Sequence, residues 1–532
     1  MATAMRIDRS CNRLAMYMSG QTAHFFFATF QRCGYLWLGG LIPVLPMTHA
    51  YAVESWTVAP KLTLTQSYSD NVTRNPASSA EDGWISEAAP GIRIAHSGTR
   101  VNLNVDYELH QFLYINRTQL NSTQNRLNSN ARIEAIDDWL FIYALANVSQ
   151  QNRSAFGASV ADFFGASTNR VETTIYQVAP NIRGRLSDLA IYQLRLNATQ
   201  SHSADPALPD TETTELAGQI RNNPSSGRMG WAVDGTSLVV RNAVVGKQEN
   251  SRVRGSLIAE IDPQLRISIM GGRELTDYAT PSVTGTSTSG AGVEWSPTVR
   301  TRIAGVYERR FFGNGHIFLF NHRTPLTAWR ISSSRDVTVF PGQLAGAQRG
   351  SIHDLLNDLL TSTIPDRVER NAAIERRLQV SGISASAPLG RGFLTGRPIL
   401  NRNHEVSFAL LGAANTATFT VFQNAQRTLG PILGNRDSFS LSNNIRQEGF
   451  NVNWSRKLSA VTSLALITSS LRSKALDGAN LESKQYSWSL FMTSQLGPVT
   501  KASVGVRHVK FESSIEAGYA ENILYGSLEV RF

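Results

Sequence analysis

The sequence predicts an all-β fold, a closed antiparallel barrel of about 22 strands, and three observations support this prediction. Short segments of alternating apolar and polar residues recur from Pro60 onward. Their connections alternate between tight turns and long polar loops. The chain ends on an amphipathic stretch, Leu524–Phe532. Because alternation gives a strand two different faces and a terminal strand needs a partner, we expect the last strand to pair with the first.

The composition favours a barrel that spans a membrane. Of the 532 residues, 42% are hydrophobic and only 17% are charged, which is too polar for a helical membrane protein and low in charge for a soluble one. Transmembrane β-barrels of the bacterial outer membrane fall in this range, because half of each strand faces lipid and half faces water. After Val53 no apolar run approaches the roughly 18–20 residues that a spanning helix needs.

The N-terminal segment has the features of a signal peptide. Basic residues precede an apolar stretch, Cys33–Met47, and a site of the A-x-A type follows at residues 50–52. We therefore expect cleavage after Ala52, export, and a mature barrel over residues 53–532. A single N-terminal membrane anchor is the alternative. The basic residues before this stretch are Arg6, Arg9, Arg13 and Arg32.

The clearest strand is predicted over residues 100–110, RVNLNVDYELH. Val101, Leu103 and Val105 fall on one face, and Asn102 and Asn104 fall on the other. Residues 251–261 and 299–309 repeat this alternation with charged side chains on the polar face. Long strands with a charged face are typical of barrel strands that cross a membrane at a tilt.

The connections predict which end of the barrel faces which compartment. Short turns on one side and long loops on the other are the arrangement of outer-membrane barrels, whose turns are periplasmic and whose loops are extracellular. With both termini periplasmic the number of strands is even, and 18 or 20 strands also fit. The turns are predicted at 137–138, 187–188, 262–264, 296–298, 413–415 and 497–499, and the long loops at 69–84, 151–171, 200–211, 274–288 and 426–436.

Leu528, Val530 and Phe532 lie on one face of the last predicted strand. An alternating strand that finishes on an aromatic residue resembles the insertion signal of outer-membrane barrels. We therefore expect these residues to close the barrel and to be read by the barrel assembly machinery of the outer membrane.

The longest connection, residues 337–402, breaks the strand pattern. Apolar residues at helical spacing predict a helix over 351–362, and a charged helix over 365–378 follows. The parity of the turns makes this connection extracellular. Its apolar helix face needs a surface to pack against, and we expect that surface to be the mouth of its own barrel, with the barrel rim or a partner as alternatives.

Three stretches of the chain resemble the outer-membrane β-barrel family associated with PEP-CTERM/exosortase systems. They are residues 60–152, beginning PKLTLTQSYSDNV, residues 307–336, and the helical stretch LLNDLLTSTIPDRVERNAAI. The resemblance covers essentially the whole mature chain. It implies a place near exopolysaccharide or PEP-CTERM export components, and it implies no activity and no functional residues.

The sequence offers no candidate catalytic or metal-binding residues. Both cysteines, Cys11 and Cys33, lie in the predicted signal peptide, so the mature chain has neither disulfides nor thiolate metal sites. The sequence contains no H-x-x-x-H, H-E-x-x-H or G-x-S-x-G motif. We therefore predict a protein that is not an enzyme and uses no metal or cofactor, although a Ser/His pair assembled across strands stays an alternative.

Arginine residues recur on the polar faces of neighbouring predicted strands. A row of arginines inside a pore would favour anions or acidic sugar polymers. Alternatively, these residues pair with Glu260, Glu308 and similar neighbours and only satisfy a polar interior. The candidate lumen-facing residues are Arg252, Arg254, Arg266, Arg300, Arg302 and Arg310.

These features together predict a non-enzymatic, porin-like barrel in the cell outer membrane of a Gram-negative bacterium. We expect it to act as a channel or scaffold linked to exopolysaccharide or PEP-CTERM export, in contact with outer-membrane lipid and lipopolysaccharide and with no nucleic acid. One alternative is a barrel enzyme that acts on lipid or surface polysaccharide. Another is a structural or adhesive barrel whose lumen is plugged by residues 337–402.

Overall fold

The computed structural model describes residues 56–159, 167–205, 208–222, 227–243, 246–339, 357, 370, 374, 393, 395–430 and 438–532. The predicted signal peptide lies outside these residues. So do the predicted helices over 351–362 and 365–378, apart from Asn357, Arg370 and Ile374, which are each in helical conformation. The two helices therefore stay a prediction.

The described residues form one antiparallel sheet of 22 strands. The described parts of the connections contain the short 3-10 helices η1 (Ala77–Ser79), η2 (Thr118–Leu120) and η4 (Ser438–Ser440). The strands are β1 (Thr57–Ser69), β2 (Gly83–Ser97), β3 (Val101–Tyr114), β4 (Ser122–Ile136), β5 (Leu140–Asn152), β6 (Arg170–Leu186), β7 (Ala190–Ser203), β8 (Thr211–Asn222), β9 (Met229–Asn242), β10 (Gly246–Asp262), β11 (Leu265–Thr276), β12 (Thr284–Thr298), β13 (Thr301–Arg310), β14 (Gly313–Arg323), β15 (Thr327–Thr338), β16 (Ile399–Leu411), β17 (Asn415–Thr428), β18 (Asn444–Lys457), β19 (Thr462–Ala475), β20 (Glu482–Gln495), β21 (Thr500–Ser513) and β22 (Tyr519–Arg531).

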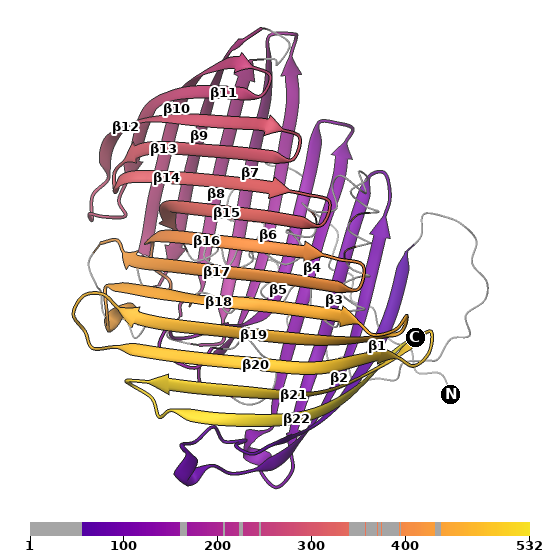
Figure 1. The fold of residues 1–532 in the computed structure, drawn as a ribbon. Coiled ribbons are helices and arrows are strands. Elements are labelled where there is room, and N and C mark those ends of the chain that lie inside the picture. Colours follow the sequence, from indigo (N-terminus) through magenta and orange to yellow (C-terminus); the bar gives the residue numbers. More distant parts are fainter. Residues whose placement is uncertain are drawn as a thin grey trace, which may run out of the picture. The chain divides into compact units, whose positions relative to one another are not determined.

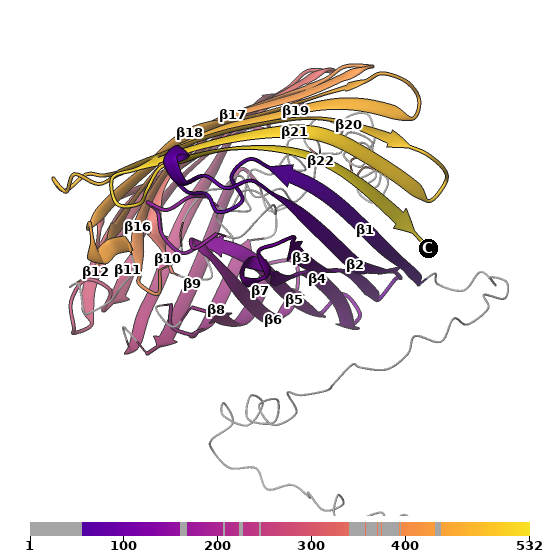
Figure 2. The ribbon, with the colours of Figure 1, turned by 90° about the horizontal axis from the view of Figure 1, so that it is seen from below.

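The sheet closes on itself, as the sequence predicted. Each strand pairs with the next one along the chain, and β1 also pairs with β22, from Lys61 opposite Arg531 to Ser69 opposite Ile523. Beyond the last strand, the backbone N–H of Phe532 donates to the carbonyl oxygen of Pro60 at 2.9 Å. Figure 2 shows β22 and β1 side by side. Closure leaves no strand edge without a partner in this sheet.

The connections follow the predicted two-sided arrangement. Residues 137–139 and 187–189 form tight turns in which Asp138 and Ser187 take positive φ angles of 53° and 50°. Such angles are accessible to Asp, Asn and Ser in turns, which explains the turn signals in the sequence. One turn lies later than predicted, because β12 continues through 296–298 to Thr298. The first strand begins, and the last strand ends, on the side of the short turns.

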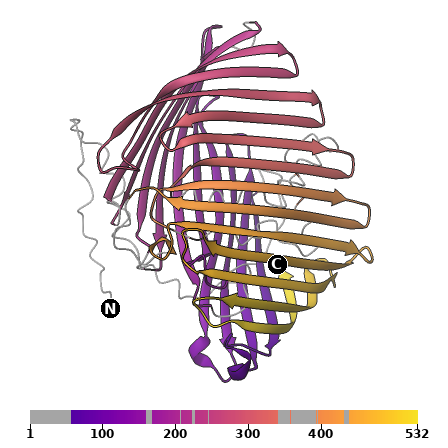
Figure 3. The same cartoon turned by 60° about the vertical axis from the view of Figure 1, so that its left-hand side comes forward.

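Figures 1 and 3 show β15–β22 on one side of the barrel and β3–β9 on the opposite side. Alternation along each strand separates an apolar outward face from a polar inward face. On β10, Val253 and Leu257 point outward and are 60% and 56% exposed, whereas Arg252 and Arg254 between them point inward. Trp295 and Trp329 lie on the outward face near the short-turn ends of β12 and β15. No helix among the described residues is long and apolar enough to cross a membrane.

Glycine is required where neighbouring strands approach each other closely on the inner face. A Cβ added to Gly272 on β11 would lie 2.1 Å from the carbonyl oxygen of Val253 on β10. The same substitution at Gly449 on β18 would place the Cβ 1.9 Å from the carbonyl oxygen of Ser470 on β19. The neighbouring backbone can approach this closely at the two positions only because no side chain is present.

Candidate functional site in the barrel lumen

The predicted arginines of β10 take part in an ion-pair network on the inner wall. Glu308 on β13 accepts hydrogen bonds from Arg252 at 3.2 Å and from Arg254 at 3.4 Å, and Arg254 also pairs with Asp234 on β9 at 3.1 Å. β11 and β12 lie between β10 and β13, so these contacts span about 14 Å of wall. Long side chains can meet across that distance only over the concave, inner face.

A second network lies nearer the long-loop end. The Glu274 carboxylate on β11 is fully buried and accepts from Arg310 on β13 at 3.1 Å and from Asn250 on β10 at 2.9 Å. Arg310 also pairs with Asp336 on β15. A buried carboxylate is tolerated only when its lone pairs are satisfied in this way.

The remaining predicted arginines lie in more exposed surroundings. Arg266 pairs with Glu260 at 3.2 Å and Arg302 pairs with Glu294 at 2.7 Å, and both arginine side chains are more than half exposed. Arg300 lies in the turn between β12 and β13, not on a strand. Five of the six arginines are thus ion-paired, which is the arrangement expected of a polar interior rather than of an unpaired anion-attracting row.

Another charged cluster, on β1–β4, was not predicted from the sequence. Glu108 on β3 pairs with Lys61 on β1, with Arg126 on β4 at 3.4 Å and with His110 at 3.2 Å. His110 also contacts Glu87 on β2 at 2.6 Å. Each of these residues occupies an alternate strand position like any other polar residue, and only the strand register brings them together.

The opposite wall, formed by β16–β20, is lined by neutral polar residues. Its buried carboxylate is Glu405, which accepts a hydrogen bond from Ser407 at 2.9 Å. Ser407 and Thr420 also share a hydrogen bond at 3.1 Å. The buried polar side chains of this neutral wall are otherwise hydroxyls and amides: Ser407, Thr416, Thr418, Thr420, Asn424, Gln426, Gln447, Asn453, Ser455, Ser463, Ser473, Ser483, Gln485, Ser487 and Thr493.

Apolar residues from three connections meet at the long-loop end of the neutral wall. Phe156 follows β5, Phe393 precedes β16 and Phe439 lies between β17 and β18, and all three are buried. The rings of Phe393 and Phe439 are 5.2 Å apart. We call this cluster the loop core: Ala155, Phe156, Phe393, Ile399, Phe439, Ile445 and Ala475.

Hydrogen bonds show how far the segment after β5 reaches. Ala155 N–H donates to Ser438 Oγ at 3.0 Å, and Ser159 N–H donates to Gln485 Oε1 on β20 at 2.6 Å. Ser513 Oγ at the end of β21 donates to the carbonyl oxygen of Phe156 at 3.2 Å. β1–β4, β21 and β22 stand between β5 and β20 in the sheet. The segment 153–159 therefore reaches across the mouth of the barrel.

The end of the longest connection reaches toward another part of the wall. The carbonyl oxygen of Gly396 accepts a hydrogen bond from Asn242 Nδ2 on β9 at 2.8 Å. A Cβ on Gly396 would lie 3.0 Å from the ring of Pro209, before β8. Thr395 and Arg397 beside it are buried. Phe393 and residues 395–398 thus lie between the loop core and the β8–β9 side of the mouth. The packing expected for the apolar helix face of this connection stays a prediction, because that face lies outside the described residues.

Within the described part of the chain, no group of three His, Cys, Asp or Glu side chains could hold a metal ion. A Ser/His arrangement does occur on the outward face: Ser333 Oγ on β15 lies 2.9 Å from His316 Nε2 on β14 and 2.9 Å from His404 Nδ1 on β16. In the described residues neither imidazole is hydrogen-bonded to a carboxylate or amide. The arrangement therefore lacks the group that orients the base in a catalytic triad.

Comparison with known proteins supplies structural similarity only. No family model matches the sequence, and no curated protein matches it. Solved barrels with similar structures include the FrpB iron transporter from Neisseria meningitidis (9% identity, TM-score 0.47, 89% of this chain and 81% of that chain). The siderophore receptor PirA (10%, 0.37, 89% and 80%) and OccK11 (11%, 0.33, 89% and 96%), both from Pseudomonas aeruginosa, are also similar. The assignment of the fold therefore rests on the strand pairing itself.

The exposed apolar residues of the outward face identify the surroundings of the barrel. Water would not favour a surface on which strand after strand carries outward Val, Leu, Ile and Phe, whereas lipid does. The inward face is polar, the strand number is even and both chain ends of the sheet lie at the short-turn end. The chain is an outer-membrane β-barrel.

Proposed function

We propose that this barrel is a non-enzymatic channel for neutral, hydroxyl-rich solutes such as sugar chains, and that it works with exopolysaccharide or PEP-CTERM export. The observation that carries the proposal is the neutral wall of β16–β20. Half-buried amide and hydroxyl side chains of this wall, such as Asn403 and Ser469, can exchange hydrogen bonds with sugar hydroxyls as a chain passes. The charged side chains of the other wall are already paired, so they do not hold an acidic or basic solute strongly.

The loop core supports a narrow or closed resting state. It brings segments from either side of the mouth together, and its phenylalanines are fully or almost fully buried. A passing polymer would need these loops to separate. Apolar contacts between loops are more easily separated than a continuous hydrogen-bonded wall, because loops open locally at low free-energy cost.

The experiment is conductance of refolded protein in planar bilayers. We expect small or infrequent conductance steps for the unmodified protein and larger, more frequent steps for F156A/F439A, because removing two rings leaves the loop core loosely packed. The matched control is F419A/F450A, which removes two phenylalanine rings from the outward face of β17 and β18. This variant should leave conductance unchanged. Silent bilayers for both variants, with correctly folded barrels, would favour a plugged structural barrel instead.

Solute choice tests the neutral wall. In liposome-swelling assays F156A/F439A should admit uncharged oligosaccharides faster than uronic acid or amino-sugar oligomers of equal size. Equal rates for all three would remove the support that the neutral wall gives. The cellular role is tested by deleting the gene and measuring surface polysaccharide, where unchanged amounts and chain lengths would count against a link to its export.

The barrel-enzyme alternative has a direct test at Ser333. A fluorophosphonate probe labels serine nucleophiles that an adjacent base activates. We expect neither labelling nor hydrolysis of short-chain acyl esters above that of S333A. Labelling that disappears in S333A would reverse this part of the proposal.

A further inference from the structure

The outward face of β15–β19 carries a cluster of basic residues above the apolar belt, at the long-loop end. Strand register places Arg335 on β15 directly opposite Arg402 on β16, and Arg446 on β18 directly opposite Lys474 on β19. Like charges that face each other across two strands destabilise the pair. The two pairs lie on either side of β17, so an anion bound between them would relieve repulsion on both sides.

Ala425 on β17 lies at the centre of this cluster. Its cross-strand partners are Arg402 on one side and Arg446 on the other, and Arg427 follows two residues later on the same face. Alanine has only a methyl side chain, so the central position between these three arginines is occupied by a small residue. We call Arg402, Arg427 and Arg446 the arginine triplet.

The arginine triplet differs from its neighbours because its charges are not neutralised by the protein. In the described chain no carboxylate forms an ion pair with Arg402, Arg427 or Arg446, and the buried Nε of Arg446 has no hydrogen-bond partner. On the adjoining outward faces, by contrast, Arg472 pairs with Glu482 at 2.8 Å and Lys510 pairs with Glu512 at 2.7 Å. The sequence therefore supplies counter-charges beside the triplet but none at it.

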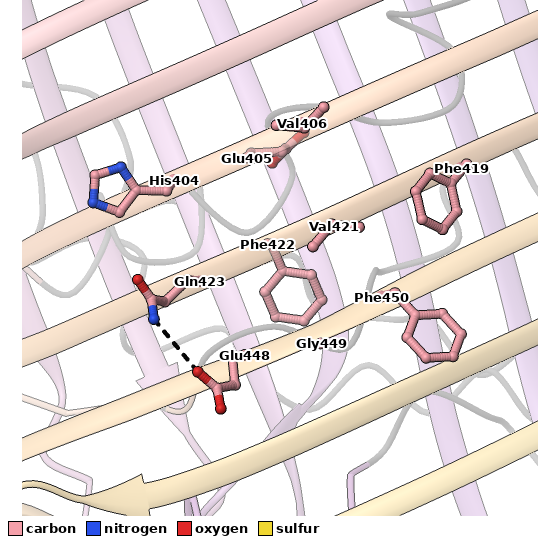
Figure 4. A pocket seen from close by; sticks show the side chains of 10 residues that line it. All are labelled: His404, Glu405, Val406, Phe419, Val421, Phe422, Gln423, Glu448, Gly449 and Phe450. Atoms are coloured by element: carbon pink, nitrogen blue, oxygen red, sulfur yellow. Dashed lines mark hydrogen bonds between the residues drawn. The ribbon is translucent and has the colours of Figure 1, made fainter.

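An apolar groove of about 790 Å³ begins next to the triplet and runs toward the short-turn end. Val406, Phe419 and Val421 line it on the outward face and are each more than 40% exposed. Figure 4 shows Gln423 and Glu448 at one end of the groove and Phe419 and Phe450 at the other. Glu448 is an acidic group at the polar end, and it is engaged by Gln423 at 3.4 Å and Arg472 at 3.7 Å.

We propose that the arginine triplet and the groove form a binding site for the phosphorylated glycolipid of the outer leaflet, with a lipid A phosphate between the guanidinium groups and an acyl chain in the groove. The triplet lies at the long-loop end, which faces the outer leaflet when the chain ends are periplasmic. Arginine matches phosphate because its fork of N–H donors binds two oxygens together. The inference rests on the barrel's place in the outer membrane, not on the solute that crosses the lumen.

The test is binding of diphosphorylated lipid A to the purified full-length protein in a nonionic detergent, measured by native mass spectrometry. Each of R402Q, R427Q and R446Q should weaken binding about fivefold, and the triple variant about a hundredfold. The matched control is R472Q/K484Q/K510Q, which removes the same charge from ion-paired positions nearby and should change binding less than threefold. Removing both phosphates from lipid A should lower binding to the unmodified protein as much as the triple variant does.

Three outcomes would overturn the proposal: equal binding by the triple variant, an equal loss in the control variant, or equal affinity for phosphatidylglycerol, which would mean attraction to any anionic lipid. If the triple variant folds poorly, the unfolding temperatures of the single variants, measured with and without lipid A, test the proposal instead. Without lipid A the single variants should unfold at the same or a higher temperature than the unmodified protein, because each removes an arginine held close to another. Lipid A should raise the unfolding temperature of the unmodified protein more than that of any single variant.

Discussion

The inner walls formed by β10–β13 and by β16–β20 line the same lumen in different ways. The first wall carries charged side chains at alternate positions, and these are joined in networks such as Arg252, Arg254 and Glu308. The second carries hydroxyls and amides, with Glu405 as its buried carboxylate. Partly buried charges need oppositely charged partners, so the charged side chains of the first wall are ion-paired with one another. Neutral groups can change hydrogen-bond partners without separating charges, so the half-buried amides and hydroxyls of the second wall can also bond a solute.

The largest effect is expected when one ion of the charged wall is removed. E308Q should lower the free energy of unfolding by about 3 kcal/mol, because two arginines lose a shared buried partner. The measurement is urea unfolding in lipid vesicles followed by tryptophan fluorescence. E294Q, which removes the partner of the exposed Arg302, is the control and should cost about 0.5 kcal/mol. Equal losses for the two substitutions would contradict the expectation that the buried network stabilises the fold more than a solvated ion pair does.

The next largest effect is expected at the end of the closing strand, where substitution of Phe532 should reduce membrane assembly more than it reduces the stability of the folded barrel. The Phe532 side chain is 69% exposed, and its backbone contact to Pro60 does not depend on the ring. F532A should therefore lower the amount of membrane-inserted protein in cells several-fold, while changing the unfolding free energy of refolded protein by less than about 0.5 kcal/mol. Heat-modifiable migration on gels reports the first quantity. Normal levels in the outer membrane would show that Phe532 is not part of the assembly signal.

A smaller effect is expected in the neutral wall. S407A removes a hydroxyl that bonds both Glu405 and Thr420, and should cost about 1 kcal/mol, the usual worth of such a contact. Urea unfolding under the conditions used for E308Q gives the comparison. A loss in unfolding free energy as large as that of E308Q would mean that the hydrogen bonds of the neutral wall contribute as much to stability as the ion pairs of the charged wall.

The smallest effect is expected in the loop between β19 and β20, and it depends on pH. Burial alone would raise the pKa of Asp477, but hydrogen bonds from Ser442 Oγ and the N–H of Asn443 outweigh it and lower the pKa. A lowered folded-state pKa stabilises the fold above about pH 4 and loses that contribution as the pH falls further. D477N should thus be less stable than the unmodified protein by about 0.5 kcal/mol at pH 7, and the difference should vanish near pH 2. A difference that persists in acid would contradict this assignment.

The fold was predictable because it depends on local pattern. Alternation in stretches such as residues 100–110 defines two faces whatever the neighbouring strand is, and turn residues such as Asp138 mark where strands end. The site was predictable only in part. Arg252 and Arg254 were recognised as polar-face residues, with pairing to Glu308 as one of two interpretations, but Glu308 lies on β13, which is not adjacent to β10. Arg300, grouped with them by spacing, lies in a turn.

The sequence by itself determined that strands alternate, that turns and loops lie at opposite ends and that the first and last strands can meet. Only the tertiary structure decided which alternate residues face one another. The register placed Arg402 and Arg446 on either side of Ala425, and the closed wall allowed segment 153–159 to reach β20. The physical reason is that a one-residue shift in pairing preserves local alternation but changes every cross-strand partner, so contacts are a property of the assembled barrel.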